Sequence, residues 1–219
     1  MGQQRTDTVA RIEACGIVAV IRIQDPSKLR AVVGALAAGG VRALEVTMSV
    51  PHAIALIAEI APTLPEDVIL GAGTVVDPDT ARAAIDAGAR YIVGPVFRPE
   101  VIAACHERDV AVMPGCFSPT EILSAWEAGA DMVKVFPATA LGPTYIRDVL
   151  APLPQVKLMP TGGVSLENAG DWIRAGSAAI GVGSAMVEAR LVASGDFAAI
   201  ALRAARFVEA VRAARERQS

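Results

Sequence analysis

The sequence predicts an α/β fold, a single (β/α)8 TIM barrel with a short N-terminal helix. A β-rich apolar segment, a turn, an Ala-rich amphipathic segment and a glycine-containing stop recur along the chain. Hydrophobic residues make up 53% and aromatic residues only 4%, so small aliphatic side chains must fill the core, as in parallel strands buried on both faces. The 219 residues are enough for one barrel and contain no long linker, so we expect one domain over residues 1–219.

The expected strands lie about 20 to 25 residues apart, which is the length of one strand–helix unit. Each is a short run rich in Val, Ile, Leu or Met and bounded by Gly, Pro or charged residues. The runs cover residues 17–23, 42–47, 68–71, 91–94, 110–114, 132–136, 156–160 and 178–182. Eight such units favour a closed barrel over an open doubly wound sheet, which is built from the same units.

Glycines mark the expected helix ends, because glycine adopts the left-handed C-terminal conformation without steric cost. A short helix at 6–14 is expected over the bottom of the barrel, and a long helix at 197–216 ends the eighth unit. The long final helix also favours the barrel. The stops read A-A-G-G-V at 37–41, D-A-G-A-R at 86–90, E-A-G-A-D at 127–131 and R-A-G-S-A at 174–178.

Composition excludes several classes of partner. The net charge is −3 without a basic stripe, which argues against nucleic acid. Apolar runs are shorter than the roughly 18 residues of a membrane span, and the N-terminus lacks the apolar region of a signal peptide. Cys15, Cys105 and Cys116 have no CxxC spacing and indicate buried free thiols in a reducing compartment. We therefore expect a cytoplasmic protein without a nucleic-acid or membrane partner.

Lys134 is the most informative residue, because it lies inside the apolar run M-V-K-V-F of the sixth expected strand. The active site of this fold lies at the C-terminal ends of the strands. The structural interpretation is a lysine that extends past a helix or pairs with a carboxylate. The functional interpretation, which we favour, is an amine in a desolvated pocket that attacks a carbonyl. Lys157, at the start of the seventh strand, is expected to be structural.

Glu45 lies in the second expected strand, between Leu44 and Val46. A carboxylate at such a position is costly unless it is paired or used. The structural interpretation is a buried salt bridge with Arg22 or Lys134, and the functional one is general acid/base catalysis. Strands of the same parity contribute to the same interior layer of a barrel, so the second and sixth strands can bring both side chains to one substrate.

Two glycine-rich turns indicate a phosphate site. T-G-G at 161–163 and G-V-G-S at 181–184 follow the seventh and eighth expected strands. Backbone N–H groups at these positions commonly bind phosphate, and glycine allows a close approach, although plain turns have the same composition. We expect no metal or other cofactor, because His52 and His106 have no second ligand at a suitable spacing and carboxylates at strand ends are few.

Taken in order, the motifs E-V-T, G-A-G-T, M-P-G, V-K-V-F-P, P-T-G-G and G-V-G-S resemble a known family. The family comprises the aldolases that cleave 2-keto-3-deoxy-6-phosphogluconate (KDPG), grouped with 4-hydroxy-2-oxoglutarate (KHG) aldolase. The resemblance extends over about residues 10–215. It implies a metal-independent class I lyase that produces pyruvate and glyceraldehyde 3-phosphate, in a cytoplasmic homotrimer.

The resemblance also implies a role for individual residues. Lys134 would form the Schiff base with pyruvate, and Glu45 would transfer protons. Thr74 and Thr161 would contact the pyruvyl carboxylate or the adjacent hydroxyl. The phosphate would be held by Gly162, Gly163, Gly183 and Ser184.

The sequence departs from part of the family at Ser49, where some members have an arginine four residues after the strand-2 glutamate. Other members have an arginine at the end of strand 1, which is Arg22 here, and we expect Arg22 to bind the substrate carboxylate. The relative that acts on the galactonate epimer also lacks the strand-2 arginine, so 2-keto-3-deoxy-6-phosphogalactonate is the alternative substrate. A phosphate-binding isomerase or thiamine-phosphate-synthase-like barrel, or a non-catalytic self-assembling barrel, would not need a lysine in strand 6.

Overall fold

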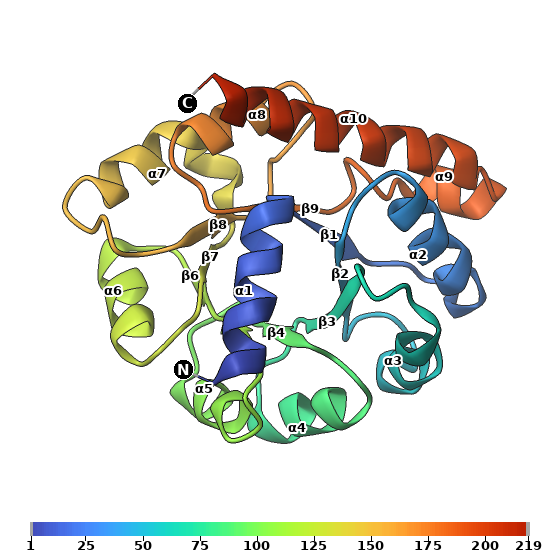
Figure 1. The fold of residues 1–219 in the computed structure, drawn as a ribbon, viewed down its shortest axis with the longest axis horizontal. Helices are drawn as coiled ribbons and strands as arrows, with labels where there is room; N and C mark the ends of the chain where they lie inside the picture. The colour runs from blue at the N-terminus through green and yellow to red at the C-terminus, as the bar shows by residue number, and fades with distance from the viewer. Residues whose placement is uncertain (1, 218–219) are drawn as a thin grey trace.

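Strands and helices alternate along the chain in the computed structural model, which describes residues 2–217 (Figure 1). The ends of the predicted 1–219 domain lie outside the described residues. The strands are β1 (Ile17–Ile21), β2 (Ala43–Thr47), β3 (Ile69–Gly73), β4 (Tyr91–Val93), β5 (Ala111–Met113), β6 (Gly115–Cys116), β7 (Val133–Val135), β8 (Leu158–Pro160) and β9 (Ile180–Val182).

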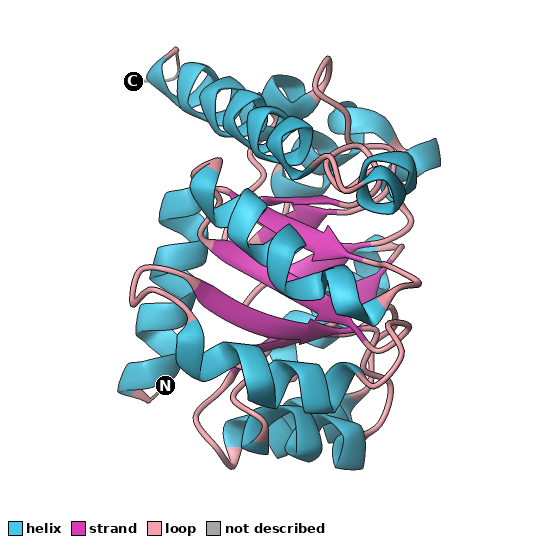
Figure 2. Ribbon diagram, turned by 90° about the vertical axis from the view of Figure 1, so that its right-hand side faces the viewer, coloured by secondary structure: helices cyan, strands magenta, loops and turns pink. Residues whose placement is uncertain are grey.

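Helices follow the strands and pack on the outside of the ring that they form (Figures 1 and 2). Short 3-10 helices lie at η1 (Pro26–Lys28), η2 (Ala61–Thr63) and η3 (Ala138–Ala140). The α-helices are α1 (Gln3–Cys15), α2 (Leu29–Ala38), α3 (Ala53–Ile60), α4 (Pro78–Asp86), α5 (Pro99–His106), α6 (Pro119–Glu127), α7 (Gly142–Leu150), α8 (Ala169–Arg174), α9 (Ala189–Ser194) and α10 (Phe197–Glu216). No helix among residues 2–217 is both long and apolar enough to cross a bilayer.

The predicted closed eight-stranded barrel is wrong. The strands pair in parallel in two separate sheets, a curled six-stranded one in the order β5-β4-β3-β2-β1-β9 and a three-stranded one in the order β6-β7-β8. The reason is local. Pro114, the last residue of the fifth predicted strand, has no N–H. β5 ends before it and pairs with β4, while β6 begins after it, beyond the predicted strand, and pairs with β7. Between β8 and β9 only an isolated bridge joins Thr161 to Gly181.

The two sheets nevertheless surround a common interior, because alternate residues of each strand point the same way. One group of apolar side chains packs between the strands and the outer helices. A second group fills the interior at the N-terminal ends of the strands and includes Val18, Tyr91, Met113, Met132 and Met159. The opposite end of the interior contains polar residues instead, and the functional side chains lie there.

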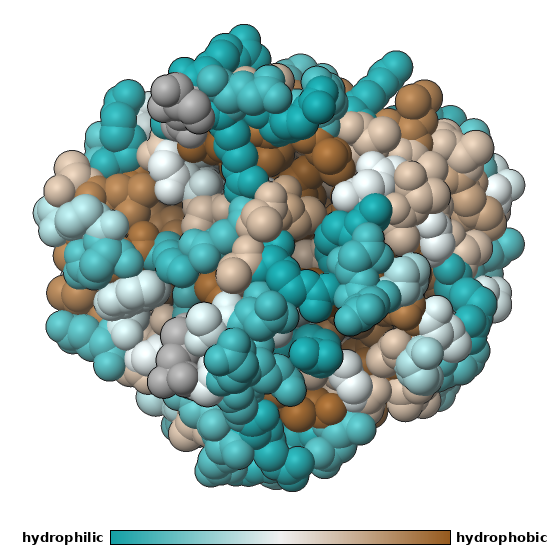
Figure 3. Space-filling model, in the orientation of Figure 1, coloured by the Kyte–Doolittle hydropathy of each residue, from teal (hydrophilic) through white to brown (hydrophobic). Residues whose placement is uncertain are grey.

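Helix α1 covers the N-terminal end of the interior, as predicted for the short helix at 6–14 (Figure 1). Its Val9 and Ile12 join the inner apolar group. Arg5 forms an ion pair with the buried Asp131, just before β7, with 3.0 Å between Nε and Oδ1. Seen from this side, hydrophilic side chains gather along α1 at the centre of the face (Figure 3). This end of the molecule is closed, so a ligand must enter from the other end.

Candidate active site

Lys134 lies at the centre of β7, and its side chain points into the shared interior. Its neighbours Val133 and Val135 belong to the outer apolar group, as the alternation of a strand requires. Lys134 is only 5% exposed. Its Nζ lies 5.1 Å from the centre of the Phe136 ring, within the range of a cation–π contact. The amine therefore lies beside apolar side chains, at the end of the interior where the polar residues gather.

Glu45 reaches Lys134 from β2. Its carboxylate is fully buried, and Oε1 lies 4.0 Å from Lys134 Nζ. Glycine at position 73 makes room for it, since a Cβ there would lie 1.9 Å from Oε1. Neither carboxylate oxygen has a hydrogen-bond partner among the described residues. Burial raises the pKa of Glu45 above its ordinary value, and the charges of Lys134 and then Arg22 offset part of the rise.

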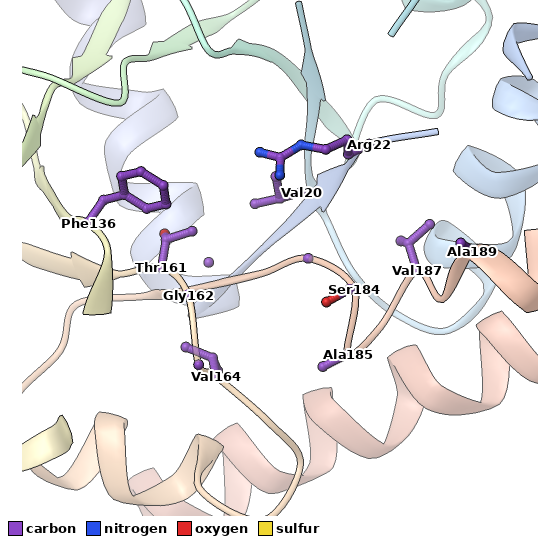
Figure 4. Close-up of a pocket in the computed structure, with 13 residues that line it drawn as sticks. Val20, Arg22, Phe136, Thr161, Gly162, Val164, Ser184, Ala185, Val187 and Ala189 are labelled. Carbon is purple, nitrogen blue, oxygen red and sulfur yellow. The ribbon is translucent and has the colours of Figure 1, made fainter. Parts of the chain in front are cut away.

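A pocket of about 250 Å³ opens at the C-terminal ends of the strands (Figure 4). Its lining includes Phe136, whose ring centre lies 5.1 Å from Lys134 Nζ. Arg22 follows β1, and its guanidinium extends over the pocket toward Phe136 and Thr161. The pocket is lined by Val20, Arg22, Phe136, Thr161, Gly162, Gly163, Val164, Gly181, Gly183, Ser184, Ala185, Val187 and Ala189. It has the size for a small molecule.

The two predicted glycine-rich turns form one wall of the pocket. Gly162 and Gly163 have φ values of 95° and 71°, which disfavour any residue with a side chain. Thr161, which precedes them, is 7% exposed, and its hydroxyl has no partner among the described residues. Gly183 and Ser184 line the same wall after β9. The wall therefore presents backbone, one buried hydroxyl and one exposed serine to a ligand.

Lys134, Glu45 and Thr74 are predicted site residues that are not among the residues lining the pocket, and neither is Ser49. Thr74 follows β3 at the same end of the strands, with a φ of 62° that is unusual for a β-branched residue, but it is not among the lining residues. Ser49 contacts Thr47 through their hydroxyl oxygens at 2.7 Å, and Thr47 donates to the carbonyl of Ile21. Ser49 thus contributes no cation to the site, and Arg22 is the arginine that lines the pocket.

Sequence reasoning missed Phe136 as a pocket residue and the buried hydroxyl of Tyr91 in the interior. Both were read only as apolar parts of strands, yet Phe136 lines the pocket and Tyr91 places a fully buried hydroxyl in the interior. The signal available was strand parity, since Phe136 lies two residues after Lys134 and faces the same side.

The cysteines and histidines lie outside this site. Burial raises the pKa of the Cys105 and Cys116 thiols to about 12, so both are unreactive, and the cysteines are free thiols. His106 lies near Asp131 beside α1, at the opposite end of the interior. Within residues 2–217, no three His, Cys, Asp or Glu side chains gather as a metal ion would require.

Comparison with known proteins identifies the family. The model of the "KDPG and KHG aldolase" family matches residues 9–202. The chain belongs to this aldolase family. It is therefore a lyase, and the resemblance inferred from its motifs is confirmed.

Two curated relatives of this aldolase carry different substrate names. A 2-dehydro-3-deoxy-phosphogluconate aldolase of Treponema pallidum is 38% identical over 195 residues, 89% of this chain and 91% of the relative. A 2-dehydro-3-deoxy-6-phosphogalactonate aldolase of Escherichia coli is 36% identical over 174 residues, 79% of this chain and 85% of the relative.

Two solved structures share the fold of this aldolase. KDPG aldolase from Legionella pneumophila, with pyruvate captured at low pH as a covalent carbinolamine intermediate, has a TM-score of 0.83 at 29% identity, covering 90% of this chain and 96% of the other. A cube-shaped, porous cage designed by fusing symmetric oligomeric domains has a TM-score of 0.86 at 34% identity, covering 93% of this chain and 74% of the other.

Proposed function

We propose that this aldolase is a class I enzyme that forms a Schiff base between Lys134 and the pyruvyl part of a phosphorylated 2-keto-3-deoxy sugar acid. The observation that carries the proposal is the buried pair of Lys134 Nζ and Glu45 Oε1, 4.0 Å apart beside a pocket that an arginine overhangs. The pair supplies a nucleophile and a proton acceptor within reach of one carbonyl carbon.

The reaction follows from these two groups. The neutral amine of Lys134 attacks the C2 ketone, and the carbinolamine loses water to give an iminium. Glu45 takes the proton of the C4 hydroxyl, the C3–C4 bond breaks, and its electrons move into the iminium to form an enamine. The aldehyde product leaves. Glu45 then returns a proton to C3, and water releases pyruvate and the free lysine.

The remaining predicted residues bind the substrate. Arg22 pairs with the C1 carboxylate, because a planar guanidinium matches a carboxylate in two hydrogen bonds. Thr161 donates its buried hydroxyl to the pyruvyl group, and Thr74 supports that side of the site from β3. The phosphate lies against the backbone of Gly162 and Gly163 and of Gly183 and Ser184.

We infer KDPG as the substrate, cleaved to pyruvate and glyceraldehyde 3-phosphate, on the support of the Treponema relative. A specific observation also favours the galactonate epimer. Position 49 is serine, and the arginine that lines the pocket lies at position 22. The Escherichia relative is named for the 6-phosphogalactonate compound. Initial rates on the two epimeric phosphosugar acids decide between them, and a kcat/KM ratio above about tenfold, or 1.4 kcal/mol, assigns the substrate.

Reductive trapping tests the mechanism. Borohydride with pyruvate should add one reduced pyruvyl group to the intact protein, and peptide mapping should find it on Lys134. The other lysines are Lys28 and Lys157, and Lys157 is an internal control because it pairs with Glu13 of α1 at 2.8 Å, at the opposite end of the interior. Trapping at Lys157, or none, would overturn the mechanism. EDTA should leave the rate unchanged, because the iminium withdraws the electrons that a metal would.

We also propose that residues 1–219 work as one unit in a cytoplasmic homotrimer. The designed cage that resembles this chain was built from symmetric oligomeric domains, which supports an oligomer. Exposed apolar side chains after β3, β4 and β6 support a contact surface at the C-terminal ends of the strands.

A further inference from the structure

Tyr91 is a buried polar residue that has no role in the proposed reaction. It lies on β4, is 0% exposed, and belongs to the inner apolar group. Its hydroxyl has no hydrogen-bond partner among the described residues. Phenylalanine would fill this space without leaving a buried hydroxyl to satisfy, so the oxygen requires an explanation.

The surroundings of Tyr91 lead to Glu45. The Tyr91 ring lies against Gly71 of β3, where a Cβ would come within 2.4 Å of a ring carbon. Gly71 is the direct partner of Glu45 in the β2–β3 register. The negative charge of Glu45 contributes to raising the pKa of Tyr91 well above 10, after burial, which is the larger cause. The phenol therefore keeps its proton and remains a donor.

The carboxylate of Glu45 also lacks hydrogen-bond partners within residues 2–217. Both of its oxygens lack hydrogen-bond partners among the described residues, and Oε1 lies 4.0 Å from Lys134 Nζ. A donor to Oε2 would fix the rotation of the carboxylate and keep Oε1 toward the amine. A buried water needs two or more polar partners, and the Tyr91 hydroxyl and Glu45 Oε2 supply two in one interior.

We propose that Tyr91 is a positioning residue of the aldolase reaction, whose hydroxyl donates through one ordered water to Glu45 and holds the ionised carboxylate toward Lys134. The inference rests on the proposed function. Tyr91 loses no proton in the cycle. The proton from the substrate goes to Glu45 and returns to the enamine carbon, and the hydrogen bond stabilises the ionised form of Glu45 that is present before the first step and restored after the second.

The test is Tyr91→Phe in the full chain, assayed by deuterium exchange into the pyruvate methyl group across pH. Loss of a donor to the carboxylate should move the acid limb up by about one pH unit and slow exchange on that limb about tenfold. The KM for pyruvate should stay within about twofold. The other charged or titratable groups facing the pair are Lys134, Arg22 and Cys15, and all remain in the variant.

Tyr145→Phe is the matched control. Tyr145 lies on α7 and donates its hydroxyl to the carbonyl of Phe117 at 2.6 Å, so the variant removes a phenolic hydroxyl elsewhere, and the acid limb should not move. In a Glu45→Gln background, Tyr91→Phe should cause no further loss, because Tyr91 acts through Glu45.

An acid limb at the wild-type position in Tyr91→Phe, or an equal added loss in the Glu45→Gln background, would overturn the inference. Trapping of wild-type Lys134 with borohydride is run alongside. If wild type is not trapped, the proposed function fails and this inference fails with it. If wild type is trapped and Tyr91→Phe behaves as wild type, only the role of Tyr91 is rejected.

Discussion

The distance between Lys134 and Glu45 has a chemical meaning at the residue scale. At 4.0 Å the two groups are at the limit of an ion pair, and the amine donates no direct hydrogen bond to the carboxylate. Two buried charges in such loose contact are poor stabilisers, because their attraction offsets little of the cost of desolvation. The pair is therefore better explained by a role in the reaction than by a contribution to the stability of the fold.

Glu45→Gln keeps the shape of the side chain and removes the proton acceptor. We expect kcat to fall by roughly 10²–10⁴, the range for a lost general acid or base. Wild-type activity should fall as the pH drops through the pKa of Glu45, which burial raises above 4.5, since the base must be ionised. Exchange of pyruvate methyl protons with deuterium measures this step. Exchange by Glu45→Gln at the wild-type rate would show that Glu45 is structural.

Arg22 is exposed at the pocket mouth, so its substitution separates binding from orientation. If it binds the substrate carboxylate, Arg22→Lys should raise KM for pyruvate and for the sugar acid by about 1–3 kcal/mol, with kcat kept. If it only orients Glu45, kcat should fall while KM stays. Arg82→Lys is the control, because Arg82 lies on α4 and pairs with Asp79 and Glu107, none of which lines the pocket. Unchanged kcat and KM in Arg22→Lys would rule out both roles.

The predicted site residues could be recognised in the sequence for one of two reasons. Lys134 and Glu45 are polar residues inside apolar strands, and Arg22 and Thr161 end strands at the functional edge. Tyr91 and Phe136 are aromatic residues in apolar strands, where sequence alone gives no reason to separate a core ring from a site ring. Their roles depend on which face of the strand they occupy and on the neighbours across the interior.

At the element scale, the strands were predictable and their hydrogen bonding was not. Each expected strand overlaps an observed one, although β3 extends two residues beyond the expected 68–71 and β6 was not predicted, and α10 spans the predicted 197–216. Expected helix stops also hold, with Gly40, Gly88, Gly129 and Gly176 at positive φ. The strand β6 was missed: the expected strand ended at Pro114, whereas the chain pairs in one sheet before this proline and in the other sheet after it.

Helix α1 should be held in place by the buried ion pair between Arg5 and Asp131. Arg5→Met should destabilise the fold by about 1–3 kcal/mol near neutral pH, because it leaves a buried carboxylate without its cation. Burial already raises the pKa of Asp131, and Arg5 lowers it. Without Arg5 the folded-state pKa rises further, so the loss should be full above that pKa and should shrink as the pH falls through it.

Denaturant unfolding at several pH values measures this effect. Arg11→Met is the control on the same helix, since the ion pair of Arg11 with Asp7 is exposed and 3.8 Å long and should contribute about 0–1 kcal/mol. A pH-independent loss in Arg5→Met, or an equal loss in both variants, would contradict the electrostatic explanation.

At the scale of the whole molecule, the N-terminal and C-terminal ends of the strands have different roles. Apolar side chains and α1 close the N-terminal end, while glycines at positions 73, 162, 163 and 181 keep the C-terminal end open for polar groups. The two ends of the strands differ in this way although the barrel is interrupted. The direction and parity of the strands decide which side chains lie at each end, and no unbroken ladder of hydrogen bonds is needed for that. This explains why the position of the site was predictable although the closure of the sheet was not.

The proposed homotrimer gives the last prediction. Val76, Val96 and Phe117 are 45%, 49% and 44% exposed. Val76 and Val96 follow the neighbouring strands β3 and β4, and Phe117 follows β6 of the second sheet, all at the open end, where exposed apolar side chains commonly mark contact with another chain. Light scattering should find three times 22.6 kDa for the wild type. Phe117→Glu should dissociate the trimer, since it places a charge in the contact. Leu202→Glu, on α10 and 57% exposed, should leave the mass unchanged. A monomeric wild type would reject the trimer, and a trimeric Phe117→Glu would reject this surface as its interface.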